Sequence, residues 1–130
     1  MDVKITPYLR NALNADAAVS GAAGLVMAAG AGLLSPVLAL PSGLLVWAGV
    51  ALAPFVVLLL VVASRSKAPA AIMVVIIAIN VLWVFGSVAL LMSSAVSPNV
   101  LGMVFVATQA IAVALFAQLQ FVGYRRARGA

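Results

Sequence analysis

The chain has 130 residues, of which 67% are hydrophobic and 7% charged, and its mean hydropathy is +1.32. In a soluble domain about a quarter of the residues are charged. This composition therefore excludes a soluble domain and indicates an integral membrane protein. The chain has no Cys and no His, which removes thiol chemistry, imidazole catalysis and most transition-metal sites. Since no nucleophile or phosphate-binding motif occurs, we expect no enzyme, no metal and no cofactor.

Four apolar segments each reach the roughly 20 residues that a helix needs to cross a hydrocarbon core. Short polar stretches separate them, which makes consecutive helices antiparallel neighbours. We therefore predict one all-α transmembrane domain over 1–130, a four-helix up-down bundle. Its parts are an interfacial helix start at 1–14, spans at 15–34, 43–64, 70–92 and 100–123, and a basic tail at 124–130.

The N-terminal stretch ITPYL favours a helix that begins before the membrane. Thr6 can cap this helix and Pro7 can be its first residue, which places Tyr8 at the interface. The opening MDVKITPYLR has no apolar stretch of the kind found in signal peptides, so we expect no removed signal peptide.

The first span contains small residues at four-residue steps, the spacing that lets two membrane helices approach closely. We call this set the small-residue ridge. Together with a neighbouring glycine, its predicted packing residues are Ser20, Gly21, Gly24, Ala28 and Gly32.

Asp16 begins this ridge. An ionised carboxylate in lipid costs roughly 2.5–3.5 kcal/mol at a helix centre, so it should find a partner. We place Asp16 near the cytoplasmic ends of the helices, where two interpretations stand. It is either a structural residue or a titratable proton or cation site. The partners expected for the structural role are Arg65, Arg125, Arg126, Gln118 and Gln120.

Near the middle of the later spans lie Pro54, Asn80 and Gln109, at similar depth. Pro54 frees the carbonyl of Val50 by lacking an N–H, which predicts a helix kink and an acceptor for Asn80. Asn80 and Gln109 could also bond to each other between helices. These residues, with Ser87 on the face of Asn80, predict either interhelical packing contacts or a polar vestibule for a small ligand.

All seven cations precede the first span, follow the second or follow the fourth. They are Lys4, Arg10, Arg65, Lys67, Arg125, Arg126 and Arg128. The positive-inside rule then places both termini in the cytoplasm. The +5 net charge thus follows from topology, which predicts contact with anionic head groups and no nucleic-acid partner. Trp47 and Tyr124 are expected to be interfacial anchors.

The segments NADAAVSGAAGL, INVLWVFGS and FAQLQFVGYRR resemble those of a family of small bacterial integral membrane proteins. The resemblance covers essentially the whole chain and implies four spans but no particular activity. Asn14 with Ser20 and Gly21 also echoes Asn80 with Gly86 and Ser87, a pattern shared by tandem hairpin repeats and by bundles without one. The glycine signature of small multidrug resistance transporters is absent from the third span, which argues against membership in that family.

Two hypotheses of different classes follow. The first is a non-catalytic accessory subunit that packs through its small-residue ridge against a larger membrane complex, respiratory or photosynthetic, or against its own copies. The second is a small carrier or a lipid- or quinone-binding bundle that uses Asp16 and the layer of Asn80 and Gln109.

Overall fold

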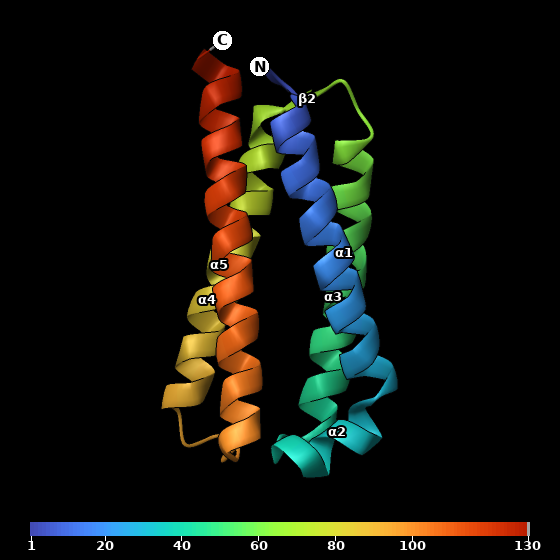
Figure 1. Ribbon diagram of the computed structural model, residues 1–130, viewed down its shortest axis with the longest axis vertical. Coiled ribbons are helices and arrows are strands. Elements are labelled where there is room, and N and C mark those ends of the chain that lie inside the picture. The colour runs from blue at the N-terminus through green and yellow to red at the C-terminus, as the bar shows by residue number, and fades with distance from the viewer. Residues whose placement is uncertain (130) are drawn as a thin grey trace.

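The computed structural model describes residues 1–129 as four long helices side by side, with both termini at one end (Figure 1). Helices α1, α3, α4 and α5 are long and apolar enough to cross a membrane, which confirms the four predicted apolar spans. The described elements in chain order are β1 (Asp2–Lys4), α1 (Pro7–Ala29), α2 (Ala31–Leu38), α3 (Ser42–Ala63), β2 (Lys67–Pro69), α4 (Ala70–Met92) and α5 (Val100–Gly129).

The first helix ends at Ala29, earlier than the predicted end of its span at residue 34. As expected, the hydroxyl of Thr6 accepts a hydrogen bond from the backbone N–H of Leu9 at 3.2 Å, and Pro7 starts α1. The helix ends before Gly30, where a Cβ atom would lie 2.6 Å from the carbonyl oxygen of Val26. The chain then forms the separate helix α2, so Pro36 lies inside a helix and not beside the hairpin turn.

The predicted basic tail is also helical. Helix α5 continues through Tyr124 to Gly129, because its last turns pack against the start of α1. A Cβ atom at Gly123 would lie 3.0 Å from the ring of Tyr8 and 3.1 Å from Leu9. Glycine at this position therefore allows the two helices to lie close together.

A two-stranded antiparallel sheet, absent from the prediction, closes the end that holds the termini. Val3 of β1 pairs with Ala68 of β2, and both are buried. Arg10 donates hydrogen bonds to the carbonyl oxygens of Ala63 and Arg65 at 2.8 and 3.0 Å. The N-terminus is thus tied to the connection between α3 and α4.

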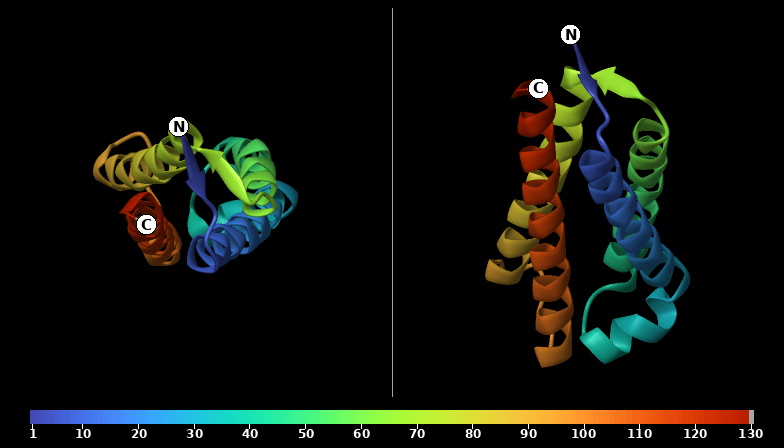
Figure 2. Two further views of the ribbon diagram at one scale, coloured as in Figure 1. Left: turned by 90° about the horizontal axis from the view of Figure 1, so that it is seen from above. Right: turned by 45° about the horizontal axis from the view of Figure 1, so that its top comes forward.

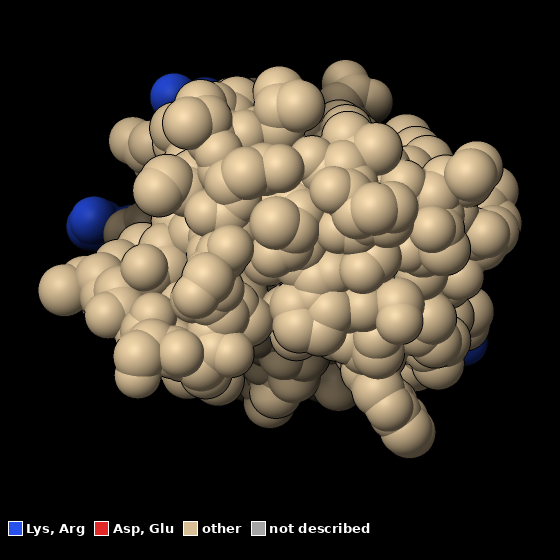
Figure 3. All heavy atoms as spheres, turned by 90° about the horizontal axis from the view of Figure 1, so that it is seen from below, with Lys and Arg blue, Asp and Glu red and all other residues tan. Residues whose placement is uncertain are grey.

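We call this end the basic end, because β1, β2, the start of α1 and the end of α5 carry the cations there. The opposite, distal end is seen in Figure 3, where tan atoms cover the face and blue lies only at its margins. The charge asymmetry predicted from the sequence is thus present in the folded chain.

The long helices form two antiparallel pairs, α1 with α3 and α4 with α5. Seen from the basic end they make a ring (Figure 2). Contacts between α1 and α5 join the pairs along the bundle, and α2 touches α5 at the distal end. Helices α3 and α4 approach each other far less, which leaves room between them.

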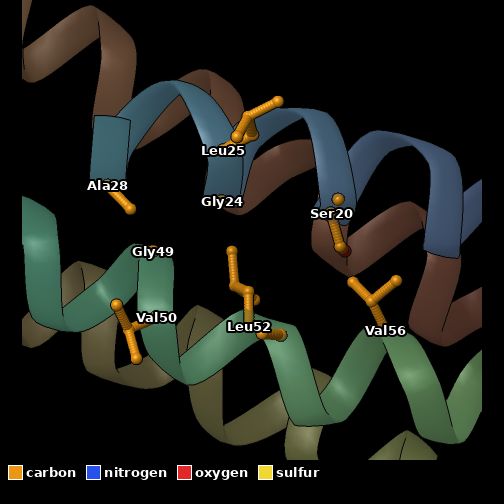
Figure 4. Close-up of a pocket in the computed structure, with 10 residues that line it drawn as sticks. Ser20, Gly24, Leu25, Ala28, Gly49, Val50, Leu52 and Val56 are labelled. Carbon is orange, nitrogen blue, oxygen red and sulfur yellow. The ribbon is translucent and has the colours of Figure 1, made fainter. Parts of the chain in front are cut away.

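The small-residue ridge of α1 faces α3, and Figure 4 shows Ser20, Gly24 and Ala28 along a groove between these two helices. A Cβ atom at Gly24 would lie 3.0 Å from the carbonyl oxygen of Gly49. Gly32 is different, because a Cβ atom there would meet nothing within 4 Å and the residue is exposed. The prediction of packing is therefore wrong for Gly32, which lies beyond the break at Gly30 on α2. A Cβ atom at Gly21 would make only an ordinary contact with Val56, at 3.8 Å.

Candidate functional site

A polar cluster lies inside the bundle, where Asp16 of α1 meets α4 and α5. The Asp16 side chain is 0% exposed. Its Oδ1 accepts a hydrogen bond from Ser20 at 2.8 Å, and its Oδ2 accepts from Asn80 at 2.8 Å and from Gln120 at 2.7 Å. The amide nitrogen of Asn80 also donates to Oε1 of Gln120 at 2.9 Å. We call these four residues the Asp16 cluster.

The partners of Asp16 are neutral, which separates the two structural alternatives left open by the sequence. The hydrogen bond to Gln120 is present, whereas Gln118 on the same helix is exposed. The arginines lie elsewhere. The guanidinium carbon of Arg126 lies 5.1 Å from the centre of the Tyr8 ring, and that of Arg125 lies 5.8 Å from the centre of the Phe121 ring. The expected pairing of Asp16 with arginine is therefore wrong.

Asp16 also lies at a different level of the bundle than predicted. It is near the middle of α1 and not near the cytoplasmic ends of the helices. It contacts Asn80, which is near the middle of α4. A carboxylate at that depth is costly unless donors surround it, and three donors do so here.

The expected bond between Asn80 and Gln109 is replaced by two separate arrangements. Asn80 bonds to Asp16 and Gln120, while Gln109 accepts a hydrogen bond from the indole N–H of Trp83. Both donors of Asn80 point into the Asp16 cluster, so it does not serve the carbonyl of Val50 near Pro54 as predicted. Pro54 itself lies inside α3 and faces outward.

Two cavities adjoin the pair formed by Trp83 and Gln109. The central cavity has a volume of about 260 Å³ and reaches all four long helices. Its lining includes Ser20, Phe55, Asn80, Trp83, Gln109 and Ala112. Asp16 is not among its lining residues, because Ser20 and Asn80 stand between its carboxylate and the cavity.

The second cavity, the lateral crevice, has a volume of about 660 Å³ and lies in the distal half of the bundle. Its walls come chiefly from α3 and α4, and it shares Trp83 and Gln109 with the central cavity. Its rim includes Trp47 and Leu82, which are 76% and 68% exposed, and Gly86, where a Cβ atom would meet nothing within 4 Å. The crevice thus opens sideways, toward the surroundings of the apolar helices.

The remaining predicted residues lie apart from these cavities or at their edge. Ser87 lines the lateral crevice and donates to the backbone oxygen of Trp83 at 2.8 Å. Tyr8 is partly exposed at the basic end, but Tyr124 is buried, with Arg128 over its ring at 5.6 Å. Tyr124 is therefore part of the buried core and not a freely exposed anchor.

Two features of the site were missed at the sequence level. Gly49 is more tightly enclosed than any residue of the ridge it faces, since a Cβ atom there would lie 2.5 Å from the carbonyl oxygen of Gly24. Gly49 and Ala53 are four residues apart, and this spacing of small residues could have predicted close helix packing. The role of Trp83 as the partner of Gln109 had no such signal, because it depends on how α4 and α5 cross.

Asn14 and Asn80, which the tandem repeat would make equivalent, have different surroundings, because Asn14 is exposed whereas Asn80 is buried. No protein-family model, curated protein or solved structure matches the chain. The resemblance to a family of small bacterial membrane proteins therefore stays a prediction.

Proposed function

We propose that this chain is a non-catalytic, multi-pass protein of the bacterial inner membrane that binds a small molecule between its two helix pairs. The observation that carries the proposal is the pair of adjoining cavities at Trp83 and Gln109, with the Asp16 cluster directly behind. Small-molecule sites are usually apolar hollows of about 300–1,000 Å³ with a few polar groups. The lateral crevice falls within this range, and the central cavity supplies the polar groups.

The geometry supports binding more than an accessory role through the small-residue ridge. Gly24 and Ala28 already lie close to Gly49 of α3 in the same chain, so this part of the motif that motivated docking onto a larger complex is used internally. A proton or cation role for Asp16 also has less support, because its carboxylate is fully enclosed by hydrogen-bond donors.

An accessory subunit remains the second candidate, favoured by one observation. In the 18-residue apolar stretch of α4, only 17% is buried inside the chain, against 33–39% in the corresponding stretches of the other three long helices. A partner protein or a second copy could cover that face. In either case we expect both termini in the cytoplasm, where the cations of the basic end contact anionic head groups.

The test is to purify the protein from its native membrane in mild detergent and to identify what accompanies it. We expect a small molecule near one per chain, retained by the wild type and lost in Ala112→Leu, which fills the central cavity. Ala114→Leu is the matched control, because Ala114 is an exposed residue of the same helix that lines neither the central cavity nor the lateral crevice. A large protein partner in fixed ratio, with no small molecule, would favour the accessory subunit.

A further inference from the structure

We infer that the cavities select an uncharged amphiphile with a hydroxylated aromatic head and a hydrocarbon chain, of the alkyl-hydroquinone class. The inference rests on the proposed small-molecule function and specifies its ligand. The head would occupy the central cavity, and the chain would leave through the lateral crevice between α3 and α4.

The first argument is the set of hydrogen-bonding atoms left for a ligand. Both hydrogen bonds of Asn80 use its amide nitrogen, since Asp16 and Gln120 accept them, so the carbonyl oxygen of Asn80 remains as an acceptor at the cavity wall. Gln109 uses its carbonyl oxygen to accept from Trp83, which leaves its amide N–H groups as donors. A hydroxyl group can donate to the first and accept from the second.

The orientation of both amides follows from their partners. The indole N–H of Trp83 can only donate, so it requires the oxygen of Gln109. Oδ2 of Asp16 and Oε1 of Gln120 both accept from Asn80, so both contacts require the amide nitrogen of Asn80. The remaining acceptor of Asn80 and donor of Gln109 are therefore consequences of the Asp16 cluster and of Trp83.

The second argument concerns charge and shape. Asp16 lies just behind Ser20 and Asn80, and the central cavity has no cation in its lining, so a negatively charged head would be both desolvated and repelled. Phe55 and Trp83 line the cavity and offer ring contacts to an aromatic head. A cavity of about 150 Å³ suffices to hold benzene, so about 260 Å³ can hold a substituted single ring.

The third argument is the change of lining along the path. The lateral crevice is lined mainly by apolar side chains such as Leu44, Leu82 and Leu90, and it has an open side at Gly86. A hydrocarbon chain placed there would bury apolar surface and still reach the lipid. The polar end and the apolar end of the path thus match the two ends of an amphiphile.

The test uses a decyl-substituted hydroquinone, decylbenzene and 4-decylbenzoate with the full chain in phosphatidylcholine nanodiscs. Binding is followed by the fluorescence of Trp47 and Trp83, which both line the crevice, at fixed lipid concentration. We expect the hydroquinone to bind most tightly and the benzoate at least tenfold more weakly. Gln109→Leu should weaken the hydroquinone roughly threefold to tenfold and leave decylbenzene unchanged, since only the hydroquinone uses the amide.

Gln118→Leu is the matched control, an exposed glutamine on the same helix, and should leave all three affinities unchanged. Gln109→Met, similar in length, repeats the test if the leucine variant unfolds. Gly86→Leu, placed at the rim of the crevice, should weaken both uncharged probes, whereas Gly32→Leu should not.

Two outcomes would overturn the inference, and they differ in what they mean for the proposed function. If the benzoate binds as tightly as the hydroquinone and Gln109→Leu changes neither, the ligand class is wrong. The binding function survives that result provided that Ala112→Leu still weakens the probes. If none of the three probes responds to Ala112→Leu, the cavity is not the binding site, and both the ligand class and the function fail.

Discussion

The Asp16 cluster and the pair of Trp83 with Gln109 are both polar groups inside an apolar bundle, but they are completed to different degrees. In the cluster, each oxygen of Asp16 is bonded and Asp16 is fully buried, so only the carbonyl oxygen of Asn80 is left for a ligand. In the pair, one hydrogen bond joins two side chains that each line open space. A closed polar group fixes helices against one another, whereas an incomplete one offers its remaining atoms to a ligand.

The difference follows from how the helices meet. Near the basic end, glycine at position 123 brings α5 against α1, and the sheet of β1 and β2 ties the N-terminus to the α3–α4 connection. Toward the distal end, α4 diverges from α3 and the lateral crevice lies between them. The bundle is therefore tightly joined at one end and opens sideways at the other.

The strongest test of the closed region is Asp16→Leu. It removes the acceptor of three buried donors, each of which costs about 1–3 kcal/mol when left unpaired. We expect a loss of about 3 kcal/mol or more in unfolding free energy, or failure to assemble, measured by thermal unfolding in detergent.

Asp16→Asn is the companion variant, and we expect it to lose only about 1–3 kcal/mol. The asparagine oxygen can accept from Asn80 and Gln120, while its nitrogen donates to the Ser20 hydroxyl, which can also accept. Equal losses for Leu and Asn would show that the charge, and not the hydrogen-bond pattern, holds the cluster together.

The next test asks whether close helix contact supports the closed region. Gly49→Leu places a side chain where even a Cβ atom would lie 2.5 Å from the carbonyl oxygen of Gly24. Overpacking of this kind costs about 1–3 kcal/mol, so we expect a lower unfolding temperature. Gly43→Leu on the same helix is the control, because a Cβ atom there meets nothing within 4 Å. If both variants are equally stable, the contact of α1 with α3 does not depend on small residues.

The sequence predicted the features that depend on one helix at a time. The four apolar spans, the cap at Thr6 and the small-residue ridge follow from composition and spacing, and the structure contains them. The hydrogen bond of Asp16 to Gln120 was among the expected alternatives, because few donors lie inside the membrane.

The features that depend on how helices cross could not be predicted. The level of Asp16 was wrong because its position relative to Asn80 depends on how α1 and α4 are shifted along each other. The partner of Gln109 was wrong because the choice between Asn80 and Trp83 depends on the relative rotation of α4 and α5. The sheet was missed because strands of three residues carry no periodic signal.

The smallest expected effect concerns the only other acidic residue, Asp2, and sharpens the contrast between buried and exposed charge. Its carboxylate lies 3.9 Å from the ammonium group of Lys67, and the two side chains are 47% and 71% exposed. Exposed pairs at this distance contribute about 0–1 kcal/mol and are screened by salt. The strands themselves are held by backbone pairing and by burial of Val3 and Ala68, which do not involve the carboxylate.

We therefore expect Asp2→Asn to change the unfolding free energy by less than about 0.5 kcal/mol, measured beside Asp16→Asn under the same conditions. Each variant removes one negative charge and replaces it with the same amide, so only the surroundings differ. A loss as large as that of Asp16→Asn would mean that net charge at the basic end controls stability. The hydrogen-bonded enclosure of Asp16 would then not be what distinguishes the closed region from the open one.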